Sequence, residues 1–387
     1  YDQQAHTYRG QRGAFTAYGD FMLSGGVFSA PSNGVVSCLA DFKHTGGIFS
    51  NNAGDISFDG TTILSDTVGN PFNDLVINGN LTAPSTLYVV SNFVNNGAFN
   101  ANGGLVYFPG NTTVGGSSTT TFDNVSISGT FAAPAAVMAV NGAWTNNGTF
   151  NPSGGTVVFN GATTISGTRT SAFNNVTING TLTSHGSYPL LVAGGWTNNG
   201  TFNHNSGTVI FNNATVIGGS GSHNFNNVTI GGTLTAPGGT LQVAGNWVNN
   251  GAFSPNSGTV VFNGNTIMSG AGSNAFHHLS IQGVLTAPSA PIYVAGNWVN
   301  DGTFTHNGGT VVFNGTSGVG GGNETSFNSV TIVTNGVLTG RAGGMNVAKN
   351  WDGSAGIYYH NSGEVRFNGT DAQEVMTGGA YNGSGNN

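Results

Sequence analysis

An all-β fold, a parallel β-solenoid (β-helix), is what the sequence of 387 residues predicts, on three observations. The phrase NWVNNGAFSPNSGTVVFNG, at residues 246–264, has near copies about every 51 residues, seven in all. Short β-branched segments stand between Asn-Gly and Gly-Gly turns, and no segment keeps the 3.6-residue apolar period of a helix. Charged residues make up 5% of the chain and aromatic residues 10%, which is the opposite of a disordered composition.

Three columns of aromatic residues keep the same period. They fall before an Asn-Asn-Gly turn, after that turn, and at the end of a VVFNG-like segment. Because successive turns of a parallel solenoid hydrogen-bond to each other, we expect equivalent side chains to stack like on like in the core. The core candidates are Phe42, Phe93, Trp144, Trp196, Trp247, Trp298 and Trp351 from the first column, and Phe58, Phe108, Phe159, Phe211, Phe262, Phe313 and Phe367 from the third.

Each copy contains a shorter echo of itself. Leu182 and Phe202 are 20 residues apart and Phe202 and Leu234 are 32 apart, which indicates a short coil followed by a longer coil with a loop. Two coils per copy predict about fourteen coils, and three coils of about 17 residues are the second choice. The turn Asn249-Asn250-Gly251 supplies residues that tolerate positive φ at a corner.

The scarcity of charge has a physical reason in such a stack, and it excludes some functions. Equivalent charged residues would lie side by side, which is destabilising. Between Asp123 and Asp301 the only charged side chain is Arg169, so this surface cannot attract nucleic acid or an anionic membrane. The single cysteine, Cys38, excludes an internal disulfide and a cysteine-based zinc site. Valine occupies its position in the other copies, which predicts a buried thiol.

The repeat also resembles a known class of proteins. The phrase GTLTAPGGTLQVAGNWVNNGAF, at residues 232–253, is similar to the coils of filamentous-haemagglutinin-like and other secreted right-handed β-helix proteins of microbial surfaces. The resemblance covers about residues 18–380 and implies a β-helix in an extracellular setting, without an active site to carry over. The chain departs from that family in its 51-residue double unit and its aromatic columns.

Few residues suggest chemistry. Asp55, Asp59 and Asp66 come nearest to the carboxylate cluster that calcium binding or glycan cleavage needs, and a solvated loop is the interpretation we favour. His204, His306 and His360 share one repeat position, where a tolerant corner is favoured over a metal site because equivalent positions would lie about 10 Å apart. We therefore expect no enzyme activity, catalytic residue, metal or cofactor.

Asn-x-Ser/Thr sequons are numerous because phrases such as NNVTI and NNGTF contain them. We expect most of them to be structural, although an exposed one could carry a glycan in an exporting cell. The candidates are Asn80, Asn124, Asn147, Asn175, Asn199 and Asn227.

The two ends of the repeat array suggest assembly. Residues 18–380 hold the seven copies, 381–387 begin a further copy, and 1–17 form an extension that we expect to act as an arm between subunits. No helical cap is predicted at either end, so the terminal coils of two copies could stack head-to-tail. The assembly candidates are Arg9, Arg12, Phe21, Leu23, Asp371, Glu374 and Tyr381.

The sequence thus predicts a structural subunit of an extracellular filament or surface fibre whose partners are copies of itself, at the cell surface or outside the cell. Surface glycans are a further candidate partner, whereas nucleic acid and membrane insertion are not expected. The alternative is the stalk or passenger region of a secreted adhesin. A polysaccharide-active β-helix enzyme is the third hypothesis.

Overall fold

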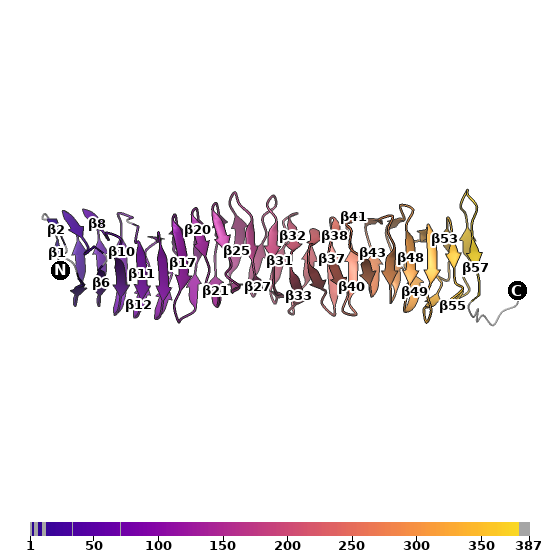
Figure 1. Cartoon of the computed structure of the whole chain (residues 1–387), viewed down its shortest axis with the longest axis horizontal. Coiled ribbons are helices and arrows are strands. Elements are labelled where there is room, and N and C mark those ends of the chain that lie inside the picture. Colours follow the sequence, from indigo (N-terminus) through magenta and orange to yellow (C-terminus); the bar gives the residue numbers. More distant parts are fainter. Residues whose placement is uncertain (1, 4–6, 10–12, 33, 70, 379–387) are drawn as a thin grey trace. The chain divides into compact units, whose positions relative to one another are not determined.

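The computed structural model describes the whole chain except residues 1, 4–6, 10–12, 33, 70 and 379–387. The described residues form 57 strands and no helix, so none of them lies in a helix that could cross a membrane. The chain divides into two compact units, Tyr1–Leu190 with Asn199–Thr201, and Leu191–Asn198 with Phe202–Asn387. Figure 1 shows the strands in the colours of the sequence. The predicted all-β fold is confirmed.

In the first unit, most strands pair in parallel with the strands three places before and after them along the chain. For example, Leu105 pairs with Asn124, and Val125 pairs with Trp144 one turn later. Three strands therefore make one turn of a parallel β-solenoid. The exceptions are β9 (Asp55–Phe58), which pairs with β11 (Asp74–Ile77), and β10 (Thr61–Asp66), which pairs with β12 (Asn80–Thr82). One repeat of this unit comprises β18 (Thr120–Phe122), β19 (Asn124–Ile127), β20 (Thr130–Ala132), β21 (Val137–Val140), β22 (Trp144–Asn146), β23 (Thr149–Asn151), β24 (Thr156–Phe159) and β25 (Ala162–Ser166).

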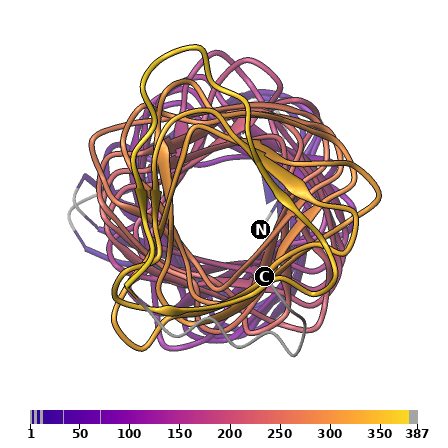
Figure 2. The same cartoon turned by 90° about the vertical axis from the view of Figure 1, so that its right-hand side faces the viewer.

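The second unit follows the same rule. Val243 pairs with Phe262, and Phe262 pairs with Ile281. Figure 2 shows the orange and yellow turns of this unit end-on, with the backbone running around a region that the core side chains fill. One repeat of this unit comprises β34 (His223–Phe225), β35 (Asn227–Ile230), β36 (Thr233–Thr235), β37 (Thr240–Val243), β38 (Trp247–Asn249), β39 (Ala252–Ser254), β40 (Thr259–Phe262) and β41 (Asn265–Ser269).

The predicted number of coils per repeat is wrong. A repeat contains eight strands and a turn takes three, so a repeat spans neither two turns nor three, and the chain has about 19 turns. The prediction of two coils failed because it used the spacing of apolar residues, whereas one of the core positions is polar. In the second unit, Thr266 pairs with Leu285, and Leu285 pairs with Phe304. Thr266 is 1% exposed and Leu285 is fully buried, whereas Phe304 is half-buried. The spacing of apolar residues in the sequence therefore does not reveal this core position.

The aromatic columns lie in the core as predicted, but they do not stack like on like. Trp247 pairs with Val228 and Met268, whereas Trp298 pairs with Leu279 and Val319. Phe262 likewise stands between a valine and an isoleucine. The reason is the eight-strand repeat, which places equivalent residues on different ladders. All fourteen core candidates are buried except Phe367, which is 40% exposed and is therefore a wrong prediction.

Asparagine and glycine do stack like on like, at one corner of the turns. In the first unit, the side-chain amide of Asn179 donates to the Oδ1 atom of Asn160 (2.9 Å), and that of Asn199 donates to Asn179 (3.2 Å). A Cβ atom on Gly180 would lie 2.2 Å from the carbonyl oxygen of Gly161 in the turn before it. These Asn-Gly pairs are thus needed because successive backbones approach closely.

The Asn-Asn-Gly turns do not use the positive φ that we expected of them. Neither Asn250 nor Gly251 has a positive φ in the structure. Positive φ values fall later in the repeat, at Asn256 (46°) and Ser257 (59°), where the chain turns into β40. Gly251 is required for a different reason, because a Cβ atom there would lie 1.9 Å from the carbonyl oxygen of Gly232.

The first residues of the chain belong to the solenoid. The strands β1 (Asp2–Gln3), β2 (Thr7–Arg9) and β3 (Phe15–Ala17) pair in parallel with β4 (Phe21–Leu23), β5 (Val27–Ser29) and β6 (Val35–Cys38). The prediction that residues 1–17 form an extension outside the solenoid is therefore wrong for these strands. Phe21 and Leu23 are fully buried below β1, so they are core residues and not exposed assembly residues.

Cys38 is buried in β6, as predicted, with 1% of its surface exposed. It pairs in register with Phe58 of β9 (Asp55–Phe58). Burial, with a smaller contribution from the charge of Asp59, raises the pKa of the Cys38 thiol to about 12. Cys38 therefore packs as a small apolar side chain and stays protonated at neutral pH.

Candidate functional site

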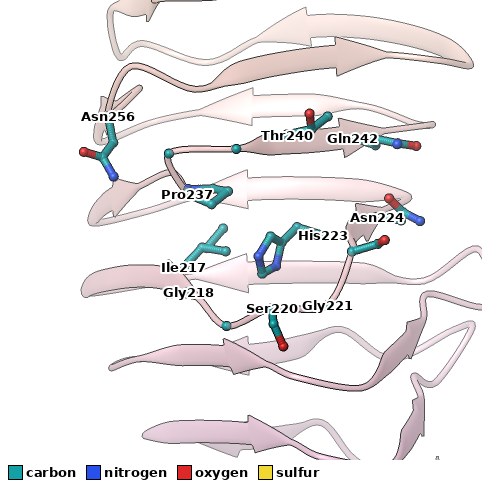
Figure 3. A pocket seen from close by; sticks show the side chains of 14 residues that line it. Ile217, Gly218, Ser220, Gly221, His223, Asn224, Pro237, Thr240, Gln242 and Asn256 are labelled. Atoms are coloured by element: carbon teal, nitrogen blue, oxygen red, sulfur yellow. The ribbon is translucent and has the colours of Figure 1, made fainter.

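A hollow of about 440 Å³ opens on the second unit where two loops come together. One loop joins β33 (Ala214–Gly218) to β34 through Gly219, Ser220 and Gly221, and the other joins β36 to β37 through Pro237 and two glycines. Figure 3 shows His223 lying between these two loops. The side chains that matter for its chemistry are Ile217, His223, Asn224, Pro237, Thr240 and Gln242.

His223 is the most unusual side chain of this hollow. It is 5% exposed, and its Nδ1 atom is buried without a hydrogen-bond partner among the described residues. Burial lowers the pKa of His223, so the imidazole is neutral at pH 7. A neutral imidazole presents one nitrogen that accepts a hydrogen bond and one that donates.

The same repeat position shows what a partnered residue does there. The indole N–H of Trp144 donates to the hydroxyl of Ser171 (3.0 Å), and the indole N–H of Trp247 donates to the Oδ1 atom of Asn274 (3.0 Å). The corresponding indole nitrogen, Nε1 of Trp196, has no such partner in the described structure. His223 thus stands where the other copies have a residue that accepts the indole N–H, and the buried Nδ1 atom of His223 has no partner among the described residues.

A second unpaired acceptor lies next to it. The Oδ1 atom of Asn224 is buried and has no hydrogen-bond partner among the described residues. Asn224 pairs in register with Gln242 across the same hollow. No Asp, Glu, Lys or Arg lines the hollow. The arrangement can accept hydrogen bonds from a neutral molecule, and its lining holds no carboxylate or fixed charge.

The glycines of the second loop widen this hollow. In the first unit, the equivalent loops enclose only about 60 Å³, and there the segment Pro134-Ala135-Ala136 replaces Pro237-Gly238-Gly239. A Cβ atom on Gly239 would meet nothing within 4 Å, so the glycine is not required by the backbone around it.

The sequence contains one signal for this site. His223 differs from the hydroxyl or amide residue that the other copies have at this position, but position 223 lies outside the three aromatic columns.

The structure does not gather the predicted acidic residues into one site. Asp55 pairs in register with Asp74, and burial together with the charge of Asp74 raises the pKa of Asp55. Asp59 accepts hydrogen bonds from Ser57 (2.6 Å) and Asn78 (2.8 Å) instead. Among the described residues, no group of three or more His, Cys, Asp or Glu side chains could hold a metal ion.

Asp66 belongs to a separate pair in the first unit. It pairs in register with His44, and the Oδ1 atom of Asp66 lies 3.1 Å from the Nδ1 atom of His44. Burial would raise the pKa of Asp66, but hydrogen bonds from His44 and from the N–H groups of Gly69 and Val68, with the charge of His44, lower it overall. Asp66 is therefore ionised, and its carboxylate joins the two paired strands that carry Asp66 and His44.

This lowered pKa predicts how the first unit responds to acid. Because the folded state binds the proton of Asp66 less readily than the unfolded state, its contribution to stability is complete above the ordinary aspartate pKa. We expect this contribution to fade as the pH falls from about 4 through the lowered value. Urea unfolding of wild type and Asp66→Asn at pH 7, 5 and 3 measures it. The variant should be less stable at pH 7, and the difference should shrink at pH 3. A difference that is independent of pH contradicts the assignment.

The three histidines of the shared repeat position lie in turns of the chain, which agrees with the interpretation that we favoured over a metal site. The Nδ1 atom of each accepts a backbone N–H two residues later, at 3.1 Å in His204, His306 and His360. Asn205 and Asn307, next to two of these histidines, have positive φ. Each imidazole thus closes its own turn.

The sequon asparagines differ in exposure. Asn80, Asn147 and Asn199 are exposed, whereas Asn124, Asn175 and Asn227 are half-buried. Two of the half-buried side chains hold the ladder: Asn124 accepts from the N–H of Ala143 (2.9 Å), and Asn227 accepts from the N–H of Asn246 (2.8 Å). The first three are therefore better placed for modification, which stays a prediction.

The second candidate surface lies on the last strands of the second unit, β55 (Ile357–Tyr359), β56 (Val365–Phe367) and β57 (Val375–Met376). Phe367, Val375 and Met376 are 40%, 46% and 38% exposed. An apolar hollow of about 190 Å³ is lined by Trp351, Tyr358, Val365, Phe367, Val375 and Thr377. Asp371 and Glu374 are exposed beside it, and Arg9 is exposed on β2 of the first unit. Arg12 and Tyr381 lie outside the described residues.

The fold and these two surfaces define the chain as a parallel β-solenoid repeat protein. Comparisons with protein-family profiles, with curated proteins and with solved structures find no match for it.

Proposed function

We propose that this protein is a structural subunit of an extracellular filament or surface fibre, in which copies stack head-to-tail through their terminal turns. In this proposal it works without catalysis, and the resemblance of its repeat to secreted β-helix proteins carries over no active site. The observation that carries the proposal is the apolar surface on β55, β56 and β57.

This surface has the chemistry of an interface. Elsewhere in the second unit, side chains such as Phe313 and Trp298 are fully buried by the turns on either side of them. Phe367 occupies the repeat position of Phe313, but β56 is the last strand of its sheet among the described residues. Another turn of the same kind, placed on β55 to β57, would bury Phe367 and Val375, which pairs with the buried Trp351. Each fully buried side chain of this size contributes about 1.5–3 kcal/mol.

A second copy is the occupant that the strand geometry favours. Every ladder is parallel, and β1, β2 and β3 are the last strands of their sheets at the other end of the described chain. In a parallel sheet, the two edges carry matching N–H and C=O groups, so a first turn fits onto a last turn as one internal turn fits onto the next. The exposed Arg9 and the exposed Asp371 and Glu374 have opposite charges, which favours this orientation.

Electron microscopy and analytical ultracentrifugation of the purified chain test the proposal. We expect filaments whose length grows with protein concentration. The variant Val375→Lys should abolish them, because a lysine on an edge strand opposes further pairing. Ile267→Lys is the matched control, since Ile267 is also exposed (56%) but lies on an internal strand of the second unit, and it should assemble like the wild type.

Dispersed single particles of the wild type at high concentration would contradict the proposal. They would favour the alternative, in which the chain is the stalk or passenger region of a secreted adhesin and its terminal turns meet more of the same polypeptide. If the Val375→Lys variant still forms filaments, the contact between copies does not involve β57.

A further inference from the structure

We propose that the hollow beside His223 binds a neutral, hydroxyl-bearing ligand about the size of a sugar ring, which donates hydrogen bonds to His223 and Asn224. This proposal concerns a different surface from the terminal turns, and it does not depend on filament assembly.

The unpaired atoms define what the ligand must supply. The Nδ1 atom of His223 and the Oδ1 atom of Asn224 are both buried and both lack a partner among the described residues. Leaving such an atom unpaired costs about 1–3 kcal/mol. The amide oxygen of Asn224 can only accept, and the imidazole of His223 has one nitrogen that accepts. Because His223 and Asn224 are consecutive residues of β34 and face opposite sides of it, each atom needs a hydroxyl donor of its own, which a ligand with several hydroxyl groups can supply.

The lining determines the charge and the size of the ligand. It contains no carboxylate to hold a cation and no Lys or Arg to hold an anion. The volume of about 440 Å³ lies in the range of small-molecule sites and is far larger than the ~30 Å³ that one water molecule occupies. Ile217 and Pro237 provide an apolar wall, while Thr240 and Gln242 add polar groups at the rim. A sugar ring combines an apolar face with hydroxyl groups at its edge, and it fits this lining.

The comparison with the equivalent hollow in the first unit supports a specific role. That hollow, of about 60 Å³, has Thr120 at the position of His223 and alanines at the positions of Gly238 and Gly239. Thr120 accepts a hydrogen bond from Asn95, so it has a partner in the core. The larger volume, the unpaired imidazole and the two glycines therefore occur together in one copy.

Nuclear magnetic resonance titration of the full chain tests the proposal. The probes are methyl glucoside, methyl galactoside and N-acetylglucosamine, and the readouts are the imidazole signals of His223 and the side-chain amide signals of Asn224 and Gln242. We expect at least one probe to shift these signals in a saturable manner at pH 7. The same glucoside with all its hydroxyl groups methylated cannot donate hydrogen bonds, and it should bind at least ten-fold more weakly.

Two variants locate the binding in the hollow without threatening the fold. His223→Ser introduces the residue found at the equivalent position 171, and it gives the indole N–H of Trp196 an acceptor. The double variant Gly238→Ala with Gly239→Ala reproduces the alanines of the smaller hollow, and the added Cβ atoms have room. Each should weaken binding at least ten-fold while its melting temperature stays at or above that of the wild type. Ser289→Ala, at the position of Gly238 in the next copy, is the matched control and should leave binding unchanged.

Three outcomes would overturn the proposal. The first is that none of the three probes shifts the signals of His223, Asn224 or Gln242. The second is that the signals shift, but His223→Ser binds as tightly as the wild type, which places the contact elsewhere. The third is that the methylated glucoside binds as well as the parent, which removes hydrogen-bond donation as the basis of recognition. Filament formation by the same variants is recorded separately, so failure here is distinguishable from failure of the assembly proposal.

Discussion

Replacing Trp247 by alanine is expected to lower the free energy of unfolding of the second unit by about 3–5 kcal/mol. Trp247 is fully buried, its ring lies 4.9 Å from that of Phe253, and its indole N–H donates to Asn274 (3.0 Å). Alanine would leave a cavity between Val228 and Met268, the ladder neighbours of Trp247. Urea denaturation followed by circular dichroism measures the loss.

Two controls separate the contributions to this loss. Trp247→Phe keeps most of the apolar volume and removes the indole N–H, so it should cost less than half as much as the alanine variant. Ile267→Ala lies on β41, the strand next to β38, but Ile267 is 56% exposed, and its cost should stay within about 0.5 kcal/mol. Equal losses for Trp247→Ala and Ile267→Ala would contradict the assignment of Trp247 to the core.

Replacing Gly283 by alanine is expected to cost about 2–3 kcal/mol, although only one methyl group is added. A Cβ atom there would lie 2.2 Å from the carbonyl oxygen of Gly264, which already accepts the N–H of Val284 at 2.9 Å. The methyl group must therefore push two successive turns apart or break this backbone hydrogen bond. The midpoint of urea unfolding, compared with that of the wild type, reports the effect.

The control for this variant is a glycine whose surroundings are open. A Cβ atom on Gly320 would meet nothing within 4 Å, and serine occupies the same repeat position at Ser166 and Ser269. Gly320→Ala should therefore leave the stability unchanged or slightly improved, because alanine restricts the unfolded chain more than glycine does. If both glycine variants behave alike, close approach of the backbones is not what requires glycine at position 283.

The sequence predicted the class of fold because the evidence for it needs no knowledge of the folded structure. Alternating β-branched segments and Asn-Gly turns require only neighbouring residues, and the constant period of about 51 residues is visible directly in the sequence. Together they identified the parallel solenoid and the buried aromatic residues. The length of one turn was harder to predict because it depends on which positions face the core. Thr266, a buried polar residue, occupies a core position that the spacing of apolar residues does not reveal. The spacing of Asn160-Gly161, Asn179-Gly180 and Asn199-Gly200, at 19 and 20 residues, was the better signal for a turn.

The His223 site could be predicted only in part. Its histidine differs from Thr120, Ser171 and Asn274 at the same repeat position, and this difference is visible in the sequence. That its imidazole and the indole of Trp196 both stay unpaired depends on distances between side chains in the fold, which no repeat pattern contains. The volume of the hollow likewise depends on how two loops of the folded unit lie against each other.

The mismatch between eight strands per repeat and three per turn has a consequence for how such a chain can change in length. Loss or duplication of one whole repeat leaves each junction with the same pairs of strands, because β38 follows β35 in its ladder just as β46 (Trp298–Asn300) follows β43 (His278–Ile281). The ladders would close again, but every loop beyond the change would emerge from the next side of the solenoid. Repeat number would therefore set the direction in which a loop such as Gly219-Ser220-Gly221 faces, and three repeats would have to be added or removed before it faced the original way again.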